Sequence, residues 1–528
     1  MNKANLTAYE VVTEENLTDI HSTGWLLRHK KTGARVMLIE NDDENKVFNI
    51  AFRTPPKDST GVAHILEHSV LCGSREFPLK DPFVELVKGS LNTFLNAMTY
   101  PDKTCYPVAS CNDKDFQNLM HVYLDAVFYP NIYKREEIFR QEGWNYHLEQ
   151  KEGPLKYNGV VYNEMKGAFS SPDEVLEREI MNHLFPDTTY GCESGGDPKN
   201  IPDLTYENFL NFHRTYYHPS NSYIYLYGNM DMEEKLAFLD EHYLSHFDYL
   251  DVDSVIQEQK AFGACRDVTL EYPVAENEGE EDNTYLSYNM VVGNAADSQM
   301  AMAFEVLDYA LLSAPGAPLK QALLDVKAGK DVYGSYDDGI LQPYFTVIAK
   351  GSNPDRKEEF VSVIRQVLGD IVKNGIDRKA VEAGINYFEF RYREADFSSY
   401  PKGLMYSLDI LGDWLYEKGN PFAQVQQLTV FEKLKKAVNE GYFEELIRKY
   451  LLENPHGCIM TLVPKKGLAA QREKELEEKL EAYRSSLSEE QLDAMVEKTK
   501  ALEAYQEAGE DPKALECIPM LKRSDIKR

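Results

Sequence analysis

The stretch His64-Ile65-Leu66-Glu67-His68 decides how this chain is interpreted. It places two imidazoles four residues apart, with a carboxylate between them. Apolar residues such as Val62 and Val70 flank it at helical spacing, and Ser59 or Thr60 can cap the start of a helix. Residues four apart lie one above the other on the same helix face. The sequence therefore predicts a helix that points both rings in the same direction.

Two imidazoles in this arrangement can reach one tetrahedral zinc ion, at about 2.0–2.1 Å. Glu67, one residue before the second His, can then reach a water molecule at that metal. The order H-x-x-E-H is the reverse of the H-E-x-x-H zinc motif. With 12 His and 87 acidic residues in 528, random placement gives roughly 0.05 such patterns. The motif therefore favours one zinc ion per chain over an exposed helix with solvated side chains.

The composition bounds the class of protein. A chain of 528 residues is too long for one core, and 43% hydrophobic with 27% charged residues is typical of soluble globular domains. No apolar run approaches the roughly 20 residues that span a bilayer, and the N-terminus lacks the apolar segment of a secretory signal. Seven scattered cysteines without a C-x-x-C pair indicate a reducing compartment. We therefore expect a cytoplasmic protein without a disulfide framework.

The charge balance restricts the partners. A net charge of −30 argues against nucleic acid or an anionic membrane, because phosphate binding needs a basic surface. It suits basic ligands, although solubility alone also explains it.

The order of predicted elements indicates an α+β fold of two similar domains, each with a mainly antiparallel sheet packed by helices. The first domain, 1–250, carries the zinc motif. Its predicted strands include 25–28, 34–39, 47–53 and 223–227, and its predicted helices include 135–147, 159–169 and 173–184.

A second domain of similar architecture is expected at 265–465, after a linker. Residues 466–508 are almost all Ala, Glu, Lys, Leu, Gln and Arg, and Ser488 to Gln491 form a capping-box pattern that opens a second helix. We therefore expect 466–528 to be a charged helical hairpin with little core of its own, followed by a tail.

A catalytic zinc site needs a third protein ligand and one open position. Glu164 is the best candidate, since in a helix it shares a face with Val160 and Val161, and a buried carboxylate needs a partner such as zinc. Glu174 and Glu177 are rivals in a more polar segment. Spacing alone leaves all three candidates open.

Several longer motifs extend beyond the zinc pattern. HILEH, NEMKGAF, SGGDPKNIP, FHRTYYHPSN, SLNTFLNAMTYPDKTCYP and DFQNLMHVYLDAVFYP together resemble the inverted-zincin peptidases of the pitrilysin and insulin-degrading-enzyme clan, in the presequence protease and falcilysin branch. The resemblance covers essentially the whole chain. It implies that His64, His68 and Glu164 bind zinc and that Glu67 is the general base of a metalloendopeptidase.

The resemblance also carries implications for substrates and partners. In this family an unfolded or short peptide adds to an edge strand, matched here by Asn96, Ala97, Met98 and Thr99. Full members are about twice as long, with two similar halves that a charged hairpin joins into a clam-shell. This chain resembles the first half plus the hinge, so we expect it to need the second half, in the same polypeptide or as a separate chain.

Two other functions compete with the endopeptidase. A peptide-binding or assembly half without turnover is the first, because the clan contains silent halves. A purely structural zinc site is the second, but such sites favour four closed ligands, commonly cysteines, and no cysteine spacing supports one. Cys72, one turn beyond His68, is interpreted as a buried structural thiol because its neighbours are apolar.

Overall fold

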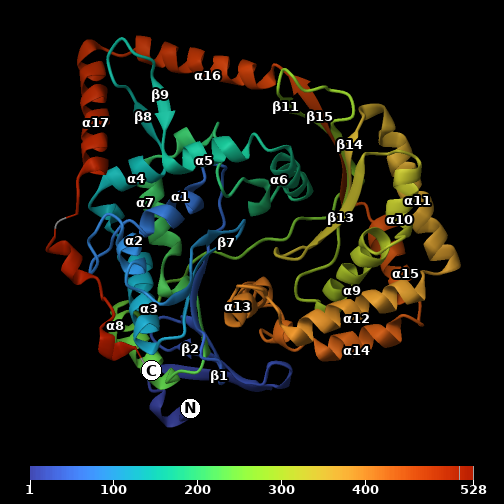
Figure 1. Cartoon of the computed structure of the whole chain (residues 1–528), viewed down its shortest axis with the longest axis horizontal. Coiled ribbons are helices and arrows are strands. Elements are labelled where there is room, and N and C mark those ends of the chain that lie inside the picture. The colour runs from blue at the N-terminus through green and yellow to red at the C-terminus, as the bar shows by residue number, and fades with distance from the viewer. Residues whose placement is uncertain (511, 527–528) are drawn as a thin grey trace.

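Two large sheets organise the chain, whose computed structural model describes residues 1–510 and 512–526 (Figure 1). The first sheet has the strand order β1-β2-β3-β10-β4-β7-β5, and β6 pairs with β7 as well. Its strands are β1 (Tyr9–Leu17), β2 (Ser22–His29), β3 (Arg35–Glu40), β4 (Lys46–Arg53), β5 (Asn92–Leu95), β6 (Met98–Thr99), β7 (Lys103–Ser110) and β10 (Ser222–Gly228).

The second sheet has the order β11-β15-β12-β14-β13. Its strands are β11 (Arg266–Val274), β12 (Thr284–Val291), β13 (Asp331–Asp337), β14 (Tyr344–Ser352) and β15 (Gly457–Lys466). A separate hairpin pairs β8 (Asn145–His147) with β9 (Lys156–Asn158).

The two large sheets share a local topology. In the first, β10 lies between β3, to which it is parallel, and β4, to which it is antiparallel. In the second, β15 lies between β11 and β12 in the same two orientations. The remaining pairings in both sheets are antiparallel. The predicted α+β class, with two mainly antiparallel sheets packed by helices, is confirmed.

Helices cover both sheets. Those before the second sheet are α1 (Val62–Val70), α2 (Pro82–Val87), α3 (Asp113–Phe128), α4 (Glu136–Glu142), α5 (Val160–Ala168), α6 (Pro172–Leu184), α7 (Tyr206–Tyr216) and α8 (Met232–His242). Those that follow are α9 (Ser298–Asp308), α10 (Pro318–Asp325), α11 (Lys357–Asn374), α12 (Arg378–Glu394), α13 (Lys402–Trp414), α14 (Leu428–Ala437) and α15 (Tyr442–Leu446). None of the helices described is long and apolar enough to cross a membrane.

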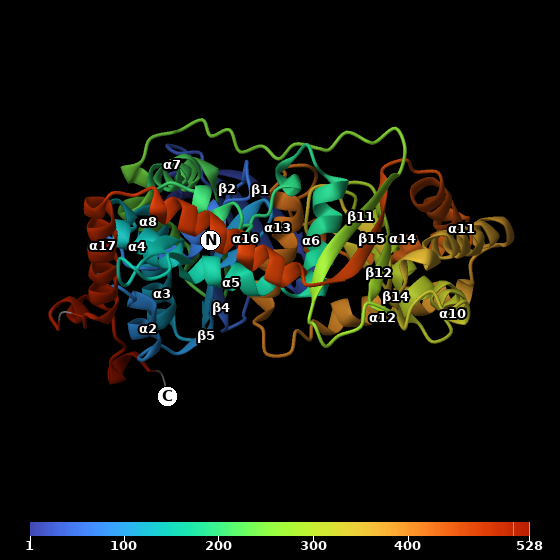
Figure 2. The same cartoon turned by 90° about the horizontal axis from the view of Figure 1, so that it is seen from above.

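A coil at 248–265 joins the two sheets and crosses the outside of the molecule, as Figure 2 shows. It occupies the stretch that the sequence left between the two expected domains. The division into domains at 1–250, 265–465 and 466–528 itself stays a prediction, and residues 511, 527 and 528 lie outside the described part.

The predicted helix at 135–147 is wrong in its second half. Helix α4 ends at Glu142, and Asn145 begins strand β8 instead. Gly143 permits the break, because a Cβ in this conformation would lie 2.8 Å from the carbonyl oxygen of Phe139 and 3.0 Å from a side-chain carbon of Ile65. The chain therefore leaves the helix at this residue and packs closely against α1.

Each sheet is covered in part by a helix from the other half of the chain. Val175, Leu176 and Ile180 of α6 belong to a buried cluster with Met460 and Leu462 of the second sheet. Burying each large apolar side chain contributes roughly 1.5–3 kcal/mol.

The reciprocal contact involves α13. Its residues Ile410, Leu411 and Trp414 are buried against Tyr223 and Tyr225 of the first sheet. Figure 1 shows α6 and α13 between the two sheets. This exchange holds the sheets in one arrangement.

A buried carboxylate strengthens the same junction. Asp102, in the turn between β6 and β7, is fully buried and accepts hydrogen bonds from the hydroxyls of Tyr190 (2.7 Å) and Tyr416 (2.6 Å). The Tyr190 hydroxyl also accepts a bond from the backbone N–H of Leu341, at 3.0 Å. The end of β6 is therefore tied to both halves of the chain.

We predict that Tyr416→Phe lowers the free energy of unfolding by about 1–3 kcal/mol, because Asp102 loses one of the hydroxyl donors to its buried charge. The midpoint of urea unfolding, followed by circular dichroism, measures the change. Tyr400→Phe, at a residue that is 53% exposed, is the matched control and should leave the midpoint unchanged. Equal midpoints for wild type and Tyr416→Phe would contradict this role of Asp102.

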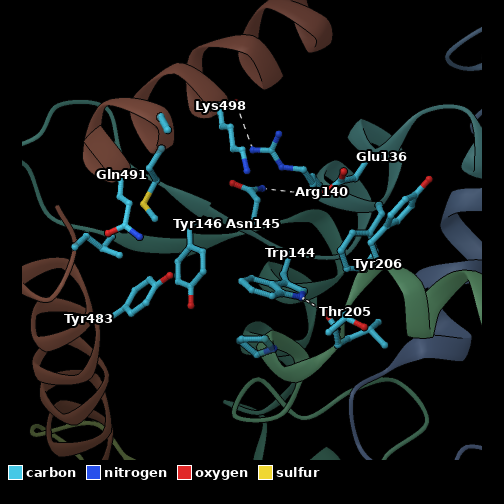
Figure 3. Close-up of a pocket in the computed structure, with 16 residues that line it drawn as sticks. Glu136, Arg140, Trp144, Asn145, Tyr146, Thr205, Tyr206, Tyr483, Gln491 and Lys498 are labelled. Atoms are coloured by element: carbon cyan, nitrogen blue, oxygen red, sulfur yellow. Dashed lines mark hydrogen bonds between the residues drawn. The ribbon is translucent and has the colours of Figure 1, made fainter. Parts of the chain in front are cut away.

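The hairpin predicted after residue 466 is present as α16 (Leu468–Ser485) and α17 (Glu489–Glu507). Both bonds of the predicted capping box form, with Gln491 N–H donating to Ser488 Oγ and Ser488 N–H donating to Gln491 Oε1. The buried side chains of the hairpin pack beside the β8–β9 hairpin, where Tyr483 stacks on Tyr146 with ring centroids 5.0 Å apart (Figure 3). The few apolar residues of the two helices thus find their core on the first half of the chain.

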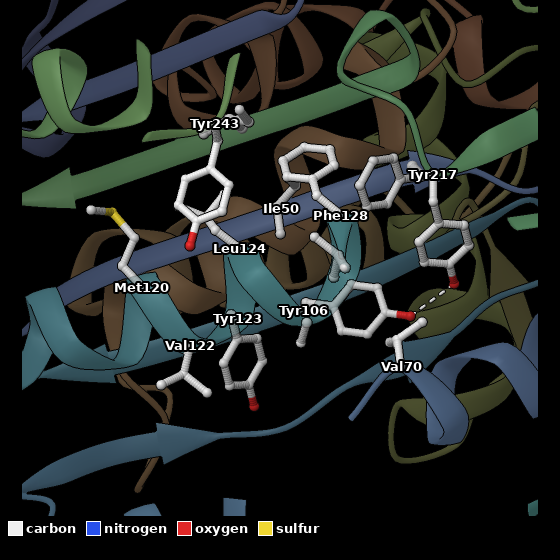
Figure 4. Close-up of a cluster of buried hydrophobic side chains, with 14 of the residues drawn as sticks. Ile50, Val70, Tyr106, Met120, Val122, Tyr123, Leu124, Phe128, Tyr217 and Tyr243 are labelled. Atoms are coloured by element: carbon white, nitrogen blue, oxygen red, sulfur yellow. Dashed lines mark hydrogen bonds between the residues drawn. The ribbon is translucent and has the colours of Figure 1, made fainter. Parts of the chain in front are cut away.

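The main core of the first half lies between its sheet and helix α3. Figure 4 shows the Tyr106 and Tyr217 hydroxyls joined by a hydrogen bond of 2.8 Å, with Val70 of α1 beside them. His213 belongs to the same region and is 4% exposed. Its Nε2 donates to the carbonyl of Val127 at 2.8 Å, so its Nδ1 accepts from the Tyr133 hydroxyl at 2.6 Å. Both ring nitrogens of this histidine are therefore occupied within the fold.

Burial lowers the pKa of His213 to about 4, against an ordinary value near 6.5. Between these two pH values the unfolded chain binds a proton that the folded chain does not. The stability is therefore complete above pH 6.5 and falls by about 3 kcal/mol as the pH drops to 4. In His213→Gln, which keeps a donor and an acceptor but does not titrate, this part of the pH dependence should be absent. Urea unfolding of both proteins across this range measures it, and parallel curves would contradict the prediction.

Candidate metal centre

Helix α1 carries the H-x-x-E-H motif and begins differently from the prediction. Its N-cap is Gly61, in the left-handed region at φ 70°, and no side chain caps the helix. Thr60 instead donates its hydroxyl hydrogen to Asp58, at 2.6 Å. A Cβ on Gly61 would lie 2.7 Å from the carbonyl oxygen of Gly195, so the helix start needs glycine to pack against this loop. The expected cap at Ser59 or Thr60 is therefore wrong.

The loop that packs there also holds the first imidazole. Nδ1 of His64 lies 3.0 Å from the carbonyl oxygen of Gly195, so Nδ1 carries the hydrogen and Nε2 is left as an acceptor. Gly195 is in turn fixed by its own N–H, which donates to Glu193 at 2.9 Å. The SGGDP segment, noticed in the sequence only as a motif, thus orients one ring.

The second imidazole is held by a carboxylate from α4. Nδ1 of His68 lies 3.2 Å from Oε2 of Glu142, which is 8% exposed. Burial lowers the pKa of His68, but the hydrogen bond with Glu142 and the charges of Glu67, Glu142 and Glu164 outweigh it, so the pKa is raised. Burial raises the pKa of Glu142, and hydrogen bonds from His68 and Gln141 outweigh it, so that pKa is lowered. The pair therefore favours Nε2 of His68 for any further ligand.

Glu164, on α5, completes the group. Its carboxylate oxygens lie 3.8 Å from Nε2 of His64 and 3.7 Å from Nε2 of His68. The three ligand atoms all lie within 4.8 Å of one another, and among the described residues this group includes neither Glu174 nor Glu177. The geometry brings together the three residues that the sequence proposed.

The reasoning that led to Glu164 was partly wrong. Val161 is fully buried, as expected, but Val160 is 43% exposed and the Glu164 side chain 53% exposed. The carboxylate therefore lies on an exposed face of α5, whereas the sequence placed it on a buried face.

The donor set fits a zinc ion. Two Nε2 atoms and one carboxylate, with both Nδ1 atoms engaged elsewhere, match a catalytic site with three protein ligands and one open position. Cys72 is not part of the group: its thiol donates to the carbonyl of His68, and burial raises its pKa well above the ordinary value. The thiol therefore stays protonated.

Glu67, the carboxylate within the motif, points to the edge of the first sheet. Its Oε2 accepts a hydrogen bond of 2.8 Å from the hydroxyl of Thr99, on β6. The side chain is half-buried, beside the two imidazoles of the same helix. One hydroxyl thus fixes the orientation of this carboxylate relative to the metal centre.

The edge segment Asn96 to Thr99 presents main-chain groups outward. Asn96 N–H donates to Pro107 O and Tyr100 N–H donates to Lys103 O, so residues 96 and 100 face β7. Because antiparallel pairing alternates, the N–H and C=O groups of Ala97 and Thr99 point away from β7. The Asn96 side chain occupies the N–H of Ala97, at 2.9 Å, which leaves Thr99 at the open edge.

Comparisons with known proteins identify the family of this chain. Three family models match the chain: insulinase (peptidase family M16) at 52–191, the peptidase M16 inactive domain at 203–388, and the associated domain of M16 peptidases of subfamily C at 462–528. The protein HypA of Clostridium perfringens is 51% identical over 98% of this chain, and presequence protease 1 of Arabidopsis thaliana is 42% identical over 99% of it. The chain belongs to the M16 peptidase family, in its presequence protease branch.

This M16 chain spans about half the length of the curated relatives it matches, 53% of HypA and 49% of the Arabidopsis protease. Solved structures share its fold. A Helicobacter pylori protease matches with a TM-score of 0.62 at 16% identity, over 86% of this chain and 99% of that one. Pitrilysin matches with a TM-score of 0.61 at 15% identity, over 87% of this chain and 47% of its own length. At such low identity the likeness is one of fold alone.

Sequence reasoning missed two residues of this M16 centre, Glu142 and Gly195. Each accepts a hydrogen bond from an imidazole Nδ1. In metal sites the second ring nitrogen of a histidine usually donates to such a carboxylate or carbonyl. The general rule could have prompted a search for such partners, but nothing in the sequence distinguishes Glu142 from its neighbours.

We predict that Glu142→Gln weakens zinc binding about 10–100-fold, because the amide supports the His68 ring less well than the carboxylate. Competition with a chromophoric chelator measures the affinity. Glu137→Gln, elsewhere on α4, is the control and should match wild type. Unchanged zinc affinity in Glu142→Gln would show that His68 does not need this partner.

Proposed function

We propose that this chain carries the catalytic centre of a zinc-dependent endopeptidase that hydrolyses short, unstructured peptides. The observation that supports it is the convergence of two imidazoles from one helical turn with the Glu164 carboxylate, beside the Glu67 carboxylate, which is not part of that group. The M16 relatives named as presequence proteases agree with a peptidase.

In this proposal His64, His68 and Glu164 hold the zinc ion, which when bound supplies Lewis acidity toward the scissile carbonyl. Glu67 acts as general base: it takes a proton from the attacking water and passes it to the leaving amine. The Thr99 hydroxyl keeps the Glu67 carboxylate oriented toward the reacting groups.

The peptide would bind by strand addition at Asn96, Ala97, Met98 and Thr99. The outward-facing groups of Thr99 lie at the sheet edge, one hydrogen bond from Glu67. Main-chain pairing of this kind supplies affinity without selecting particular side chains. The net charge of −30 favours the approach of basic peptides.

Two further expectations belong to this proposal. Because the chain spans about half of its curated relatives, and the Glu164 side chain is 53% exposed, a second half of the clam-shell would cover the centre. The same facts also fit the alternative, a non-catalytic peptide-binding or assembly half that needs a second-half chain. The cytoplasmic location stays a prediction, since the Arabidopsis and Xenopus relatives are named as chloroplastic or mitochondrial.

We predict that Glu67→Gln retains zinc but loses turnover by at least about 100-fold, because the general base is removed while the ligands stay. Zinc content and cleavage of a quenched fluorescent peptide measure the two effects, with and without an added second-half chain.

Two carboxylate variants act as controls for this experiment. Glu164→Gln should lose zinc as well as turnover, whereas Glu174→Gln should lose neither. Near-normal cleavage by Glu67→Gln would remove this residue from the base role. A zinc-loaded wild type that binds the peptide but never cleaves it, even with the second half, would favour the non-catalytic alternative.

A further inference from the structure

A groove of about 630 Å³ lies between helix α4, strand β8 and the C-terminal hairpin (Figure 3). This volume is that of a small-molecule site. Arg140 of α4 lines the groove, and Glu142 on the same helix contacts His68. The groove and the metal centre are therefore separate places that share one helix.

Aromatic rings form the walls. Trp144 lies across the middle of the groove, with Tyr206 on one side and Tyr146 and Tyr483 on the other (Figure 3). Trp144 meets Tyr146 edge-on at 5.2 Å, and its Nε1 donates to the Leu204 carbonyl at 2.9 Å, which fixes the indole. Such walls accept a flat apolar ring by stacking.

A buried acceptor faces the groove without a partner. Asn145 is 5% exposed, and its Nδ2 donates to the carbonyls of Arg140 (2.8 Å) and Asn158 (3.2 Å). These two carbonyls fix which end of the amide is nitrogen. Its Oδ1 is buried and has no hydrogen-bond partner, and in Figure 3 this oxygen points toward the hairpin side of the groove. A buried acceptor left in this way is costly, so it calls for an N–H donor.

Two cations border this acceptor. Arg140 Nη2 donates to the main-chain carbonyl of Lys498, at 3.3 Å, and both side chains line the groove (Figure 3). Within 1–510 and 512–526 neither side chain forms an ion pair, although the chain carries 87 acidic residues against 57 basic ones. Unpaired cations beside a desolvated amide favour an anionic group, which Arg can bind through two parallel bonds.

We propose that this groove binds an aromatic residue with a free carboxylate, whether a free amino acid or the C-terminal residue of a short peptide. The ring stacks on Trp144, the carboxylate pairs with Arg140 and Lys498, and the N–H on the same carbon donates to Asn145 Oδ1. Glu136 also lines the groove and would accept from a free ammonium group. All of these residues line the same groove.

Calorimetric titration of the full chain tests the site with N-acetyl-L-phenylalanine as the probe. Its amide, which lacks the carboxylate, should bind at least about tenfold more weakly, and N-acetyl-L-alanine, which lacks the ring, likewise. L-phenylalanine identifies the source: tighter binding than the N-acetyl compound indicates a free amino acid, and weaker binding indicates a peptide C-terminus. Either order supports the site.

Variants locate the binding. Lys498→Gln and Arg140→Gln should each weaken binding at least about fivefold. Lys500→Gln is the matched control, since Lys500 lies on the same helix, is exposed and pairs with Glu497. Trp25 and Trp414 are buried, so a ligand-induced change in tryptophan fluorescence should vanish in Trp144→Phe. No binding at 10 mM probe, about the weakest affinity of interest, would overturn the proposal. Equal binding of the acid and its amide would also overturn it, as would wild-type affinity in both Lys498→Gln and Arg140→Gln.

Discussion

Fixing the Nδ1 atom of each imidazole is the constraint on which the rest of the site depends. His64 is held by a main-chain carbonyl at Gly195 and His68 by the buried carboxylate of Glu142. With both Nδ1 atoms engaged, the two Nε2 atoms are directed to one point, where Glu164 meets them. A histidine without such a partner could rotate or change tautomer, and the donor set would no longer converge.

The fold supplies these partners from three separate segments. The loop that carries Gly195 packs on the glycine N-cap of α1, and α4 reaches the other ring because Gly143 ends it tightly against the same helix. The sheet edge then brings Thr99 to Glu67. Helix α1 is therefore surrounded by its own supports, and the chemistry of the centre follows from packing around one short helix.

Local patterns predicted much of this and nonlocal contacts did not. The four-residue spacing of the two rings and the capping box at Ser488 depend only on neighbouring residues, so the sequence sufficed for both. Helical periodicity favoured Glu164 without excluding its rivals, and the family resemblance singled it out. Its exposure was predicted wrongly because burial depends on what packs against the helix. The support of His68 by Glu142 crosses 74 residues of chain, and no short-range signal encodes it.

The exchange of α6 and α13 between the sheets has a consequence for any attempt to divide the chain. A fragment that stops in the coil near residue 250 would leave Tyr223 and Tyr225 of the first sheet without the helix that shields them, and α6 without its sheet. The complementary fragment would leave the second sheet without α6 and α13 without the first sheet. The two sheets are therefore not expected to fold as independent units. A movement that admits a substrate would have to occur at an interface other than the one between these sheets.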